Sequence, residues 1–207
     1  MNKINQIYNI LFKEYGPMNW WPTKTSNKKF EVSIGAILTQ NTNWKNVEKA
    51  INNLIENNLL SQESMIKIET KKLAKIIKSS GYHNQKAKKL KEFVKFLNSK
   101  KEVSRNNLLN IWGIGKETAD SILLYAHNNP IFVIDAYTKR IFSRIGFDEN
   151  DYNELQSLFT NNLKQDINLY KEYHALLVEH GKNICKTKPL CNRCCLNKIC
   201  SYPKTIS

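Results

Sequence analysis

The sequence has few of the residues that break or cross-link a chain. Among 207 residues there are seven glycines and five prolines, and all five cysteines lie in CKTKPLCNRCCLNKIC, residues 185–200. No apolar run reaches the length of a membrane span, and the N-terminal MNKINQIYNILFKEYG is amphipathic, unlike a secretory signal. We therefore expect a soluble intracellular protein, located in the cytoplasm with the bacterial or archaeal nucleoid, whose one large or two small domains are stabilised by an apolar core.

Arginine and negative charge are also scarce. Only four of 32 basic residues are arginine, and 18 acidic residues leave a net charge of +14. A field of that sign favours nucleic acid or an anionic membrane as partner. The abundance of Lys, Asn and Ile leaves an alternative, in which the charge reflects an AT-rich genome.

Apolar residues recur at helical spacing almost throughout, as in Ile4, Ile7, Tyr8, Leu11 and Phe12. The short β-like run IFVI (131–134) is too isolated to form a sheet. The pattern predicts an all-α protein of roughly nine or ten helices. Breaks are expected at Gly16-Pro17, at Gly81 and at 128–130, the best candidate for a domain junction.

The segment WGIGKETA (112–119) predicts a turn that binds an anion. Gly113 and Gly115 lie between two apolar helices, and backbone N–H groups of such a turn, together with the following helix start, can hold a phosphate. Lys116 would add a charge, and Thr118 belongs to the same helix start. The alternative is an ordinary glycine-capped corner between two helices.

With its flanks, this hairpin resembles the helix-hairpin-helix DNA glycosylases of the endonuclease III superfamily. The resemblance runs from Trp20 to Cys200. It implies two all-α lobes, a helical barrel of residues 22–128 and a cluster domain of residues 1–21 plus 129–207, with the active site at the cleft between them. It also implies a monomer that acts on double-stranded DNA containing damaged bases, with no membrane partner.

The same resemblance implies a catalytic aspartate. In VIDAYTKRIFSRIG the matching position is Asp135, although an acidic residue at a helix start can also be only a cap. An ionised carboxylate near C1′ would stabilise the cationic sugar as the base departs and could orient a water.

Bifunctional members of the superfamily have a lysine immediately before the Thr-Ala pair of the hairpin, where this chain has Glu117. A carboxylate cannot form an imine, and Lys116 lies about 100° away around the helix. We therefore expect a monofunctional glycosylase. Two alternatives stay open: a bifunctional enzyme for oxidised pyrimidines that uses another lysine, and a catalytically idle module that recognises lesions.

A further resemblance, to the 3-methyladenine DNA glycosylase branch, lies in MNWWPTKT and LTQNTNWKNVEKA. It implies that Trp20, Trp21 and Trp44 enclose the extruded base beside Glu117, and that Gln40 fills the space left in the duplex. Aromatic faces suit a cationic alkylated purine. Core packing is the alternative for each tryptophan.

One further loop and the four histidines have simpler interpretations. The loop SSGYHNQK resembles a strand-contacting loop of the family through Gly81, Asn84, Gln85 and Lys86, although a solvated basic face has the same pattern. The four histidines lack ligand spacing and are interpreted as structural; they are His83, His127, His174 and His180.

The cysteine tail predicts a metal centre. Cys185, Cys191, Cys194 and Cys200 form C-x5-C-x2-C-x5-C, a four-thiolate set. The superfamily carries a [4Fe-4S] cluster on nearly this spacing, usually with one more residue in the first interval. Zinc is the alternative, although its sites more often pair two CxxC knuckles. Cys195, beside Cys194, could compete as a ligand.

Overall fold

The computed structural model describes residues 2–202, and the chain forms two compact units. One unit comprises Met1–Trp20 with Asn129–Ser207, and the other comprises Trp21–Asn128. We call them the split unit and the central unit. Within the described residues, no helix is both long and apolar enough to cross a membrane.

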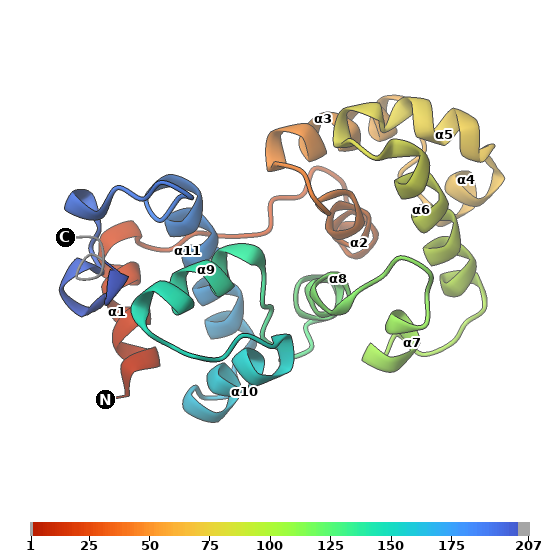
Figure 1. Cartoon of the computed structure of the whole chain (residues 1–207). Helices are drawn as coiled ribbons and strands as arrows, with labels where there is room; N and C mark the ends of the chain where they lie inside the picture. The colour runs from red at the N-terminus through yellow and green to blue at the C-terminus, as the bar shows by residue number, and fades with distance from the viewer. Residues whose placement is uncertain (1, 203–207) are drawn as a thin grey trace. The chain divides into compact units, whose positions relative to one another are not determined.

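Helices make up all the regular structure of residues 2–202, which confirms the all-α prediction (Figure 1). The central unit contains α2 (Lys28–Leu38), α3 (Trp44–Glu56), α4 (Gln62–Lys67), α5 (Thr70–Ile76), η1 (Lys78–Ser80), α6 (His83–Asn98), α7 (Arg105–Leu109), α8 (Lys116–Ser121) and η2 (Ile122–Ala126). The split unit contains α1 (Lys3–Tyr15), α9 (Ala136–Ile145), α10 (Tyr152–Asn162), α11 (Ile167–Asn183), η3 (Cys191–Arg193) and η4 (Asn197–Ile199).

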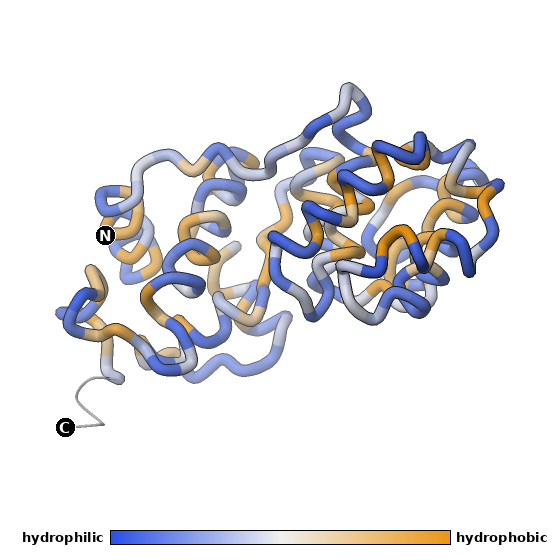
Figure 2. The backbone as a smooth tube through the Cα atoms, turned by 90° about the horizontal axis from the view of Figure 1, so that it is seen from above, coloured by the Kyte–Doolittle hydropathy of each residue, from blue (hydrophilic) through white to orange (hydrophobic). Residues whose placement is uncertain are grey.

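The eleven α-helices of the described residues exceed the expected nine or ten. The difference lies in short helices such as α4 and α7, which have six and five residues. A helix that makes fewer than two turns shows an apolar repeat too short to recognise in sequence. Figure 2 shows hydrophobic and hydrophilic residues alternating along the longer helices, where the repeat is readable.

Asparagine, aspartate and serine determine where many helices begin. Their side chains accept a hydrogen bond from a backbone N–H of the first turn, which satisfies a donor that the helix itself leaves open. The residues that cap in this way are Asn2, Asn27, Asn43, Ser61, Ser104, Asp135, Asp151 and Asp166. The helix breaks predicted from glycine also hold, since α1 ends at Tyr15, directly before Gly16 with φ 69°.

The core of the split unit is aromatic. Residues 131–134 form no strand, and Phe132 from this segment stacks on Phe159 of α10 with ring centroids 3.9 Å apart. Tyr170 and Tyr173 of α11 meet Phe132 edge-on. The apolar run read as β-like therefore serves as a buried connection between η2 and α9, and leads directly to Asp135.

The central unit is built around α2, which is buried on all sides and packs on η2, α3 and α6. Lys86 of α6 also lies inside, with 1% of its surface exposed. Its ammonium donates to the carbonyl of Leu38 at 2.8 Å and to that of Ser80 at 2.6 Å. The predicted DNA contact of Lys86 is therefore wrong, because this side chain closes the C-terminal end of α2.

The helix-hairpin-helix consists of α7, the turn 110–115 and α8. Arg105 of α7 binds Asp120 of α8 through two hydrogen bonds, Nε–Oδ1 at 2.6 Å and Nη2–Oδ2 at 3.0 Å. Asp120 is fully buried, so its charge is compensated mainly by this arginine. The pair fixes the two helices of the hairpin against each other.

The two glycines of the turn have different roles. Gly113 adopts φ 82°, and a Cβ there would lie 2.6 Å from Cε of Lys89, whose stem crosses the turn. Gly115 is extended, with φ −95°, and a Cβ there would meet nothing within 4 Å. The fold thus requires glycine at 113, whereas nothing in the chain itself requires it at 115.

Replacing each glycine by alanine separates these roles. Gly113→Ala should lower the free energy of unfolding by about 1–3 kcal/mol, because a side chain at positive φ is strained. Gly115→Ala should leave it unchanged or raise it by about 0.4–1 kcal/mol, since alanine restricts the unfolded chain. Urea denaturation followed by circular dichroism measures both, and equal losses at the two positions would contradict this account of the turn.

Candidate functional site

Asp135 lies at the start of α9, where its carboxylate is both a cap and a candidate catalyst. Oδ1 accepts a hydrogen bond from the backbone N–H of Thr138 at 2.7 Å, and 9% of the residue is exposed. The side chain thereby satisfies an N–H that the first turn of the helix leaves open. Asp135 is therefore a helix cap, and the cap uses only one of its two oxygens.

The second oxygen faces a histidine. Oδ2 of Asp135 lies 3.8 Å from Nε2 of His174 on α11, which is 6% exposed. Burial lowers the pKa of His174 from its ordinary 6.5, and the negative charge of Asp135 opposes part of that shift. His174 is therefore neutral at pH 7, and the charge of Asp135 is not cancelled by it.

Close packing of α9 on α11 brings this pair together. Gly181 of α11 has no room for a side chain, because a Cβ there would lie 2.7 Å from the ring of Tyr137 on α9. The sequence interpretation of His174 as merely structural missed its position beside Asp135. No sequence spacing connects residues 135 and 174, since only the packing of two helices joins them.

In the central unit, the predicted base-pocket tryptophans lie in one aromatic cluster. Trp21 lies 5.2 Å from Trp44 at an interplanar angle of 85°, and 5.3 Å from Tyr125. Gly35 lets the Trp21 indole lie directly on α2, because a Cβ there would be 3.2 Å from the ring. Trp20 ends the split unit, so the two neighbouring indoles belong to different units.

This arrangement differs from the predicted enclosure of a base between tryptophans. The pocket beside Trp21 and Trp44 has a volume of about 20 Å³, which is no larger than a water molecule needs. Two indoles in edge-to-face contact leave no parallel slot for a purine. A base could lie between these two rings only after they had separated.

Gln40 is held by the hairpin. Its Nε2 donates to the carbonyl of Gly113 at 3.1 Å and to Oγ1 of Thr118 at 2.9 Å, and its Oε1 accepts from Nζ of Lys89 at 2.5 Å. The predicted insertion of Gln40 into a duplex would exchange these bonds for contacts with DNA. The Thr118 hydroxyl is turned inward, so only the backbone N–H of Thr118 is placed for a phosphate.

The start of α8 presents the remaining hairpin residues. The first backbone bond of the helix runs from the N–H of Ala119 to the carbonyl of Gly115 at 2.9 Å, so the N–H groups before it point beyond the helix start. Glu117 is exposed at the second position, and Lys116 is half-buried at the first. Position 117 thus presents a carboxylate at the hairpin, where an amine would be needed for covalent chemistry.

Tyr82 is a surface feature that the sequence interpretation left out. It precedes α6 in the loop SSGYHNQK, with 67% of its surface exposed and a left-handed backbone at φ 44°. Exposed aromatic side chains held in strained backbone often mark a contact surface. Its neighbours in the loop, Asn84 and Gln85, are also exposed.

The predicted metal ligands share one pocket. Cys185, Cys191, Cys194 and Cys200 line it together, whereas Cys195 is absent from its lining. Arg144 Nη1 lies 3.3 Å from the sulfur of Cys185, and His180 Nε2 lies 3.5 Å from that of Cys194. No disulfide joins the five cysteines, and within residues 2–202 no three metal-binding side chains are arranged for a single ion.

The chain is similar to known DNA repair proteins in sequence and in fold. The chain is 46% identical over 212 residues to a "putative DNA repair glycosylase" of Methanocaldococcus jannaschii, covering 95% of each protein. It is 32% identical to a Helicobacter pylori 3-methyladenine DNA glycosylase solved with 1,N6-ethenoadenine, with a TM-score of 0.75 over 87% of this chain and 98% of the other. A DNA complex of endonuclease III shares the fold, with 21% identity and a TM-score of 0.87 over 100% and 99% of the two chains.

A family model provides the assignment. The description "HhH-GPD superfamily base excision DNA repair protein" matches residues 34–165, which include the hairpin and Asp135. The resemblance to endonuclease III inferred from the sequence is thereby confirmed. The chain belongs to the HhH-GPD superfamily of base excision DNA repair proteins.

Proposed function

We propose that this protein is a monofunctional DNA glycosylase that releases alkylated purines, such as 3-methyladenine, from double-stranded DNA. Its class is that of the family: a DNA glycosylase, which hydrolyses N-glycosyl bonds in base excision repair. One observation carries the finer proposal. The chain has a buried carboxylate at Asp135 and a second carboxylate, Glu117, in place of a hairpin amine.

Asp135 would act on the sugar. As the base departs, positive charge develops at C1′, and a carboxylate held at the start of α9 stabilises it. The Thr138 N–H holds Oδ1 in place, while neutral His174 leaves the charge of Oδ2 available. A water attacking C1′ would complete hydrolysis, giving free base and an abasic site.

The identity of the base is inferred from its leaving ability and from the aromatic cluster. A purine alkylated on a ring nitrogen carries positive charge and departs as a neutral molecule, so a single carboxylate suffices. Trp21, Trp44 and Tyr125 offer π-faces of the kind that bind such a cation. The similar H. pylori enzyme, whose structure contains a modified adenine, supports a purine.

A second candidate function is a bifunctional glycosylase for oxidised pyrimidines. The presence of Lys116 in the hairpin favours it, since an amine could form a Schiff base with C1′. Lys116 is the first residue of α8 and Glu117 the second, so their side chains point about 100° apart around the helix. The monofunctional alternative therefore has the better support.

DNA would be held by the hairpin. The open space at Gly115 allows a phosphate to approach the backbone, and the N–H groups at the start of α8 are donors for it. Lys116 adds charge, and Tyr82 offers a ring that could enter the base stack. The net charge of +14 supports this partner.

We also propose a [4Fe-4S] cluster at Cys185, Cys191, Cys194 and Cys200. These four cysteines line one pocket and Cys195 does not, and four thiolates are the ligand set of such a cluster. Such a cluster would link η3, η4 and the end of α11, and its role would be structural. Purified protein should then absorb near 400 nm, roughly where iron–sulfur charge transfer occurs and zinc does not absorb.

The experiment that tests the function uses a panel of duplexes, each with one altered base. The panel comprises 3-methyladenine, 7-methylguanine, ethenoadenine, thymine glycol, uracil opposite guanine and thymine opposite guanine. We expect free base from an alkylated purine, and no covalent adduct when borohydride is present. An efficient adduct would support the bifunctional alternative. Release of uracil or thymine alone would mean that the substrates are deaminated bases and not alkylated purines.

Asp135→Asn should separate binding from chemistry. The amide keeps the shape and an oxygen for the Thr138 N–H but lacks the charge, so single-turnover base release should fall by about 10²–10³-fold. Affinity for damaged duplex should stay within about threefold, because the phosphate contacts are unchanged. Gel-shift and quench-flow assays on one preparation measure both, and a variant that cleaves at the normal rate would refute the role of Asp135.

His174 should set the acid limit of the reaction. Because its pKa is lowered from 6.5, His174 becomes charged only below that pH, and imidazolium would then pair with Asp135 and cancel its charge. The rate should therefore fall as pH drops below about 6.5. In His174→Gln this acid limb should move to lower pH, and an unchanged pH–rate profile would mean that His174 does not titrate against Asp135.

A further inference from the structure

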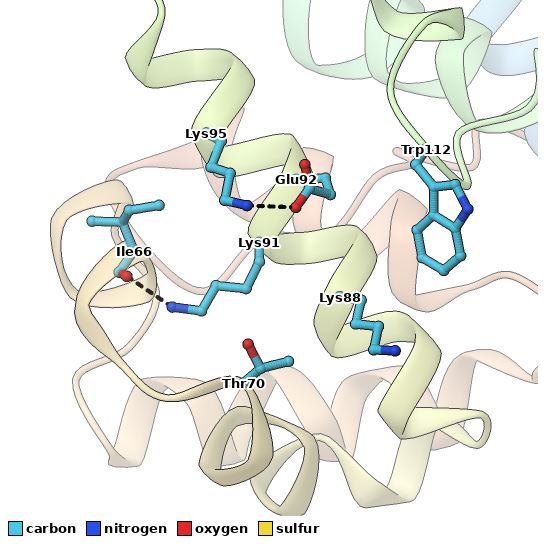
Figure 3. Close-up of a pocket in the computed structure, with 7 residues that line it drawn as sticks. All are labelled: Ile66, Thr70, Lys88, Lys91, Glu92, Lys95 and Trp112. Carbon is cyan, nitrogen blue, oxygen red and sulfur yellow. Dashed lines mark hydrogen bonds and ion pairs between the residues drawn. The ribbon is translucent and has the colours of Figure 1, made fainter.

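A pocket of the central unit lies apart from the tryptophan cluster, none of whose rings lines it. It has a volume of about 570 Å³ and is lined by Ile66, Thr70, Lys88, Lys91, Glu92, Lys95 and Trp112 (Figure 3). The volume lies within the range of about 300–1,000 Å³ that small-molecule sites occupy. None of the roles assigned above uses this pocket.

Trp112 has a large exposed surface for a tryptophan. Its surface is 57% exposed, and its ring makes no aromatic contact within residues 2–202. It directly precedes Gly113, so the hairpin turn carries the indole at the edge of the pocket (Figure 3). A large flat ring in this position is available for stacking.

The lysines of the pocket differ in how they are engaged. Lys95 pairs with Glu92 at 2.7 Å, and Lys91 donates to the carbonyl of Ile66 at 2.8 Å. Lys88 forms no hydrogen bond or ion pair with the described residues, and it extends to the side of α6 on which Trp112 lies (Figure 3). An aromatic face and an uncompensated ammonium thus border the same hollow.

We propose that this pocket binds a nucleotide of single-stranded DNA, with its base stacked on Trp112 and its phosphate at Lys88. A base inside a duplex is covered on both faces, so only an unpaired base can reach the indole. The same turn carries the hairpin, so a strand held there could continue into the pocket. The proposal rests on the proposed function only in taking DNA as the ligand of the hairpin.

This ligand explains the features better than an acidic peptide would. A carboxylate-rich segment needs the cations but gains little from a bare indole. A nucleotide uses both, since stacking contributes about 1–3 kcal/mol per base and is tolerant of sequence. The site would therefore favour lesions next to gaps, ends or other unpaired nucleotides.

The test is the binding of a fluorescein-labelled oligothymidylate to the purified holoprotein, followed by anisotropy. Trp112→Ala should weaken binding by about 5–100-fold, while Trp112→Phe retains most of it. Lys88→Glu should also weaken binding and reduce the salt dependence by about one phosphate contact. Lys49→Glu, which reverses another exposed lysine of the same unit, is the matched control and should change affinity by less than about twofold.

Several outcomes would overturn the proposal. These are wild-type affinity in Trp112→Ala, an equal loss in Lys49→Glu, or competition by polyglutamate as strong as that by unlabelled oligothymidylate, which would indicate a peptide site. If Trp112→Ala does not fold, the affinities of Lys88→Glu and Lys49→Glu still test the proposal, because both lysines are exposed and neither substitution should disturb folding. Base release from an intact damaged duplex is measured separately, so the failure of either proposal can be distinguished from that of the other.

Discussion

The shape of the hairpin depends on one buried ion pair. Asp120 is wholly enclosed, and the guanidinium of Arg105 meets both of its oxygens. Removing Arg105 would leave the charge of Asp120 inside the central unit, where water cannot solvate it. The start of α8 is thereby held in place, and the turn before it can present backbone donors without moving.

Side chains from α6 and from the loop after α2 contact that turn. Lys89 of α6 crosses Gly113 and reaches Gln40, and Gln40 in turn binds the turn carbonyl and Thr118. Gln40, which we expect to enter DNA, thus also stabilises the hairpin turn that we expect to bind phosphate. DNA that displaces Gln40 would release one constraint on the hairpin at the moment when phosphate contacts replace it.

The sequence was informative where function depends on local geometry. The hairpin glycines, the aspartate at a helix start and the clustered cysteines each lie within one short segment, so their spacing is visible along the chain. His174 could not be found in this way, since it meets Asp135 only through the packing of α9 on α11. Lys86 was misjudged for a similar reason: a basic residue in a polar segment looks solvated, and only the fold places it against the end of α2.

Aromatic residues were the hardest to interpret from sequence. The resemblance implies that Trp21 and Trp44 enclose a base, whereas in the structure they pack on each other, and Trp112, to which the sequence assigns no role, has an exposed indole. An indole suits a core and a binding surface equally well, so composition alone cannot separate the two. The structure adds what composition lacks: Gly35 allows the Trp21 indole to rest on α2, where it packs against Trp44 and Tyr125.

The five-residue π-helix η2 has a consequence for that aromatic cluster. It follows α8 without a break, and its wider turn accommodates one residue more than an α-helical turn would. Tyr125 lies within this wider turn and meets Trp21 with ring centroids 5.3 Å apart, so the backbone winding of η2, as well as the choice of side chain, determines where this ring joins the aromatic cluster.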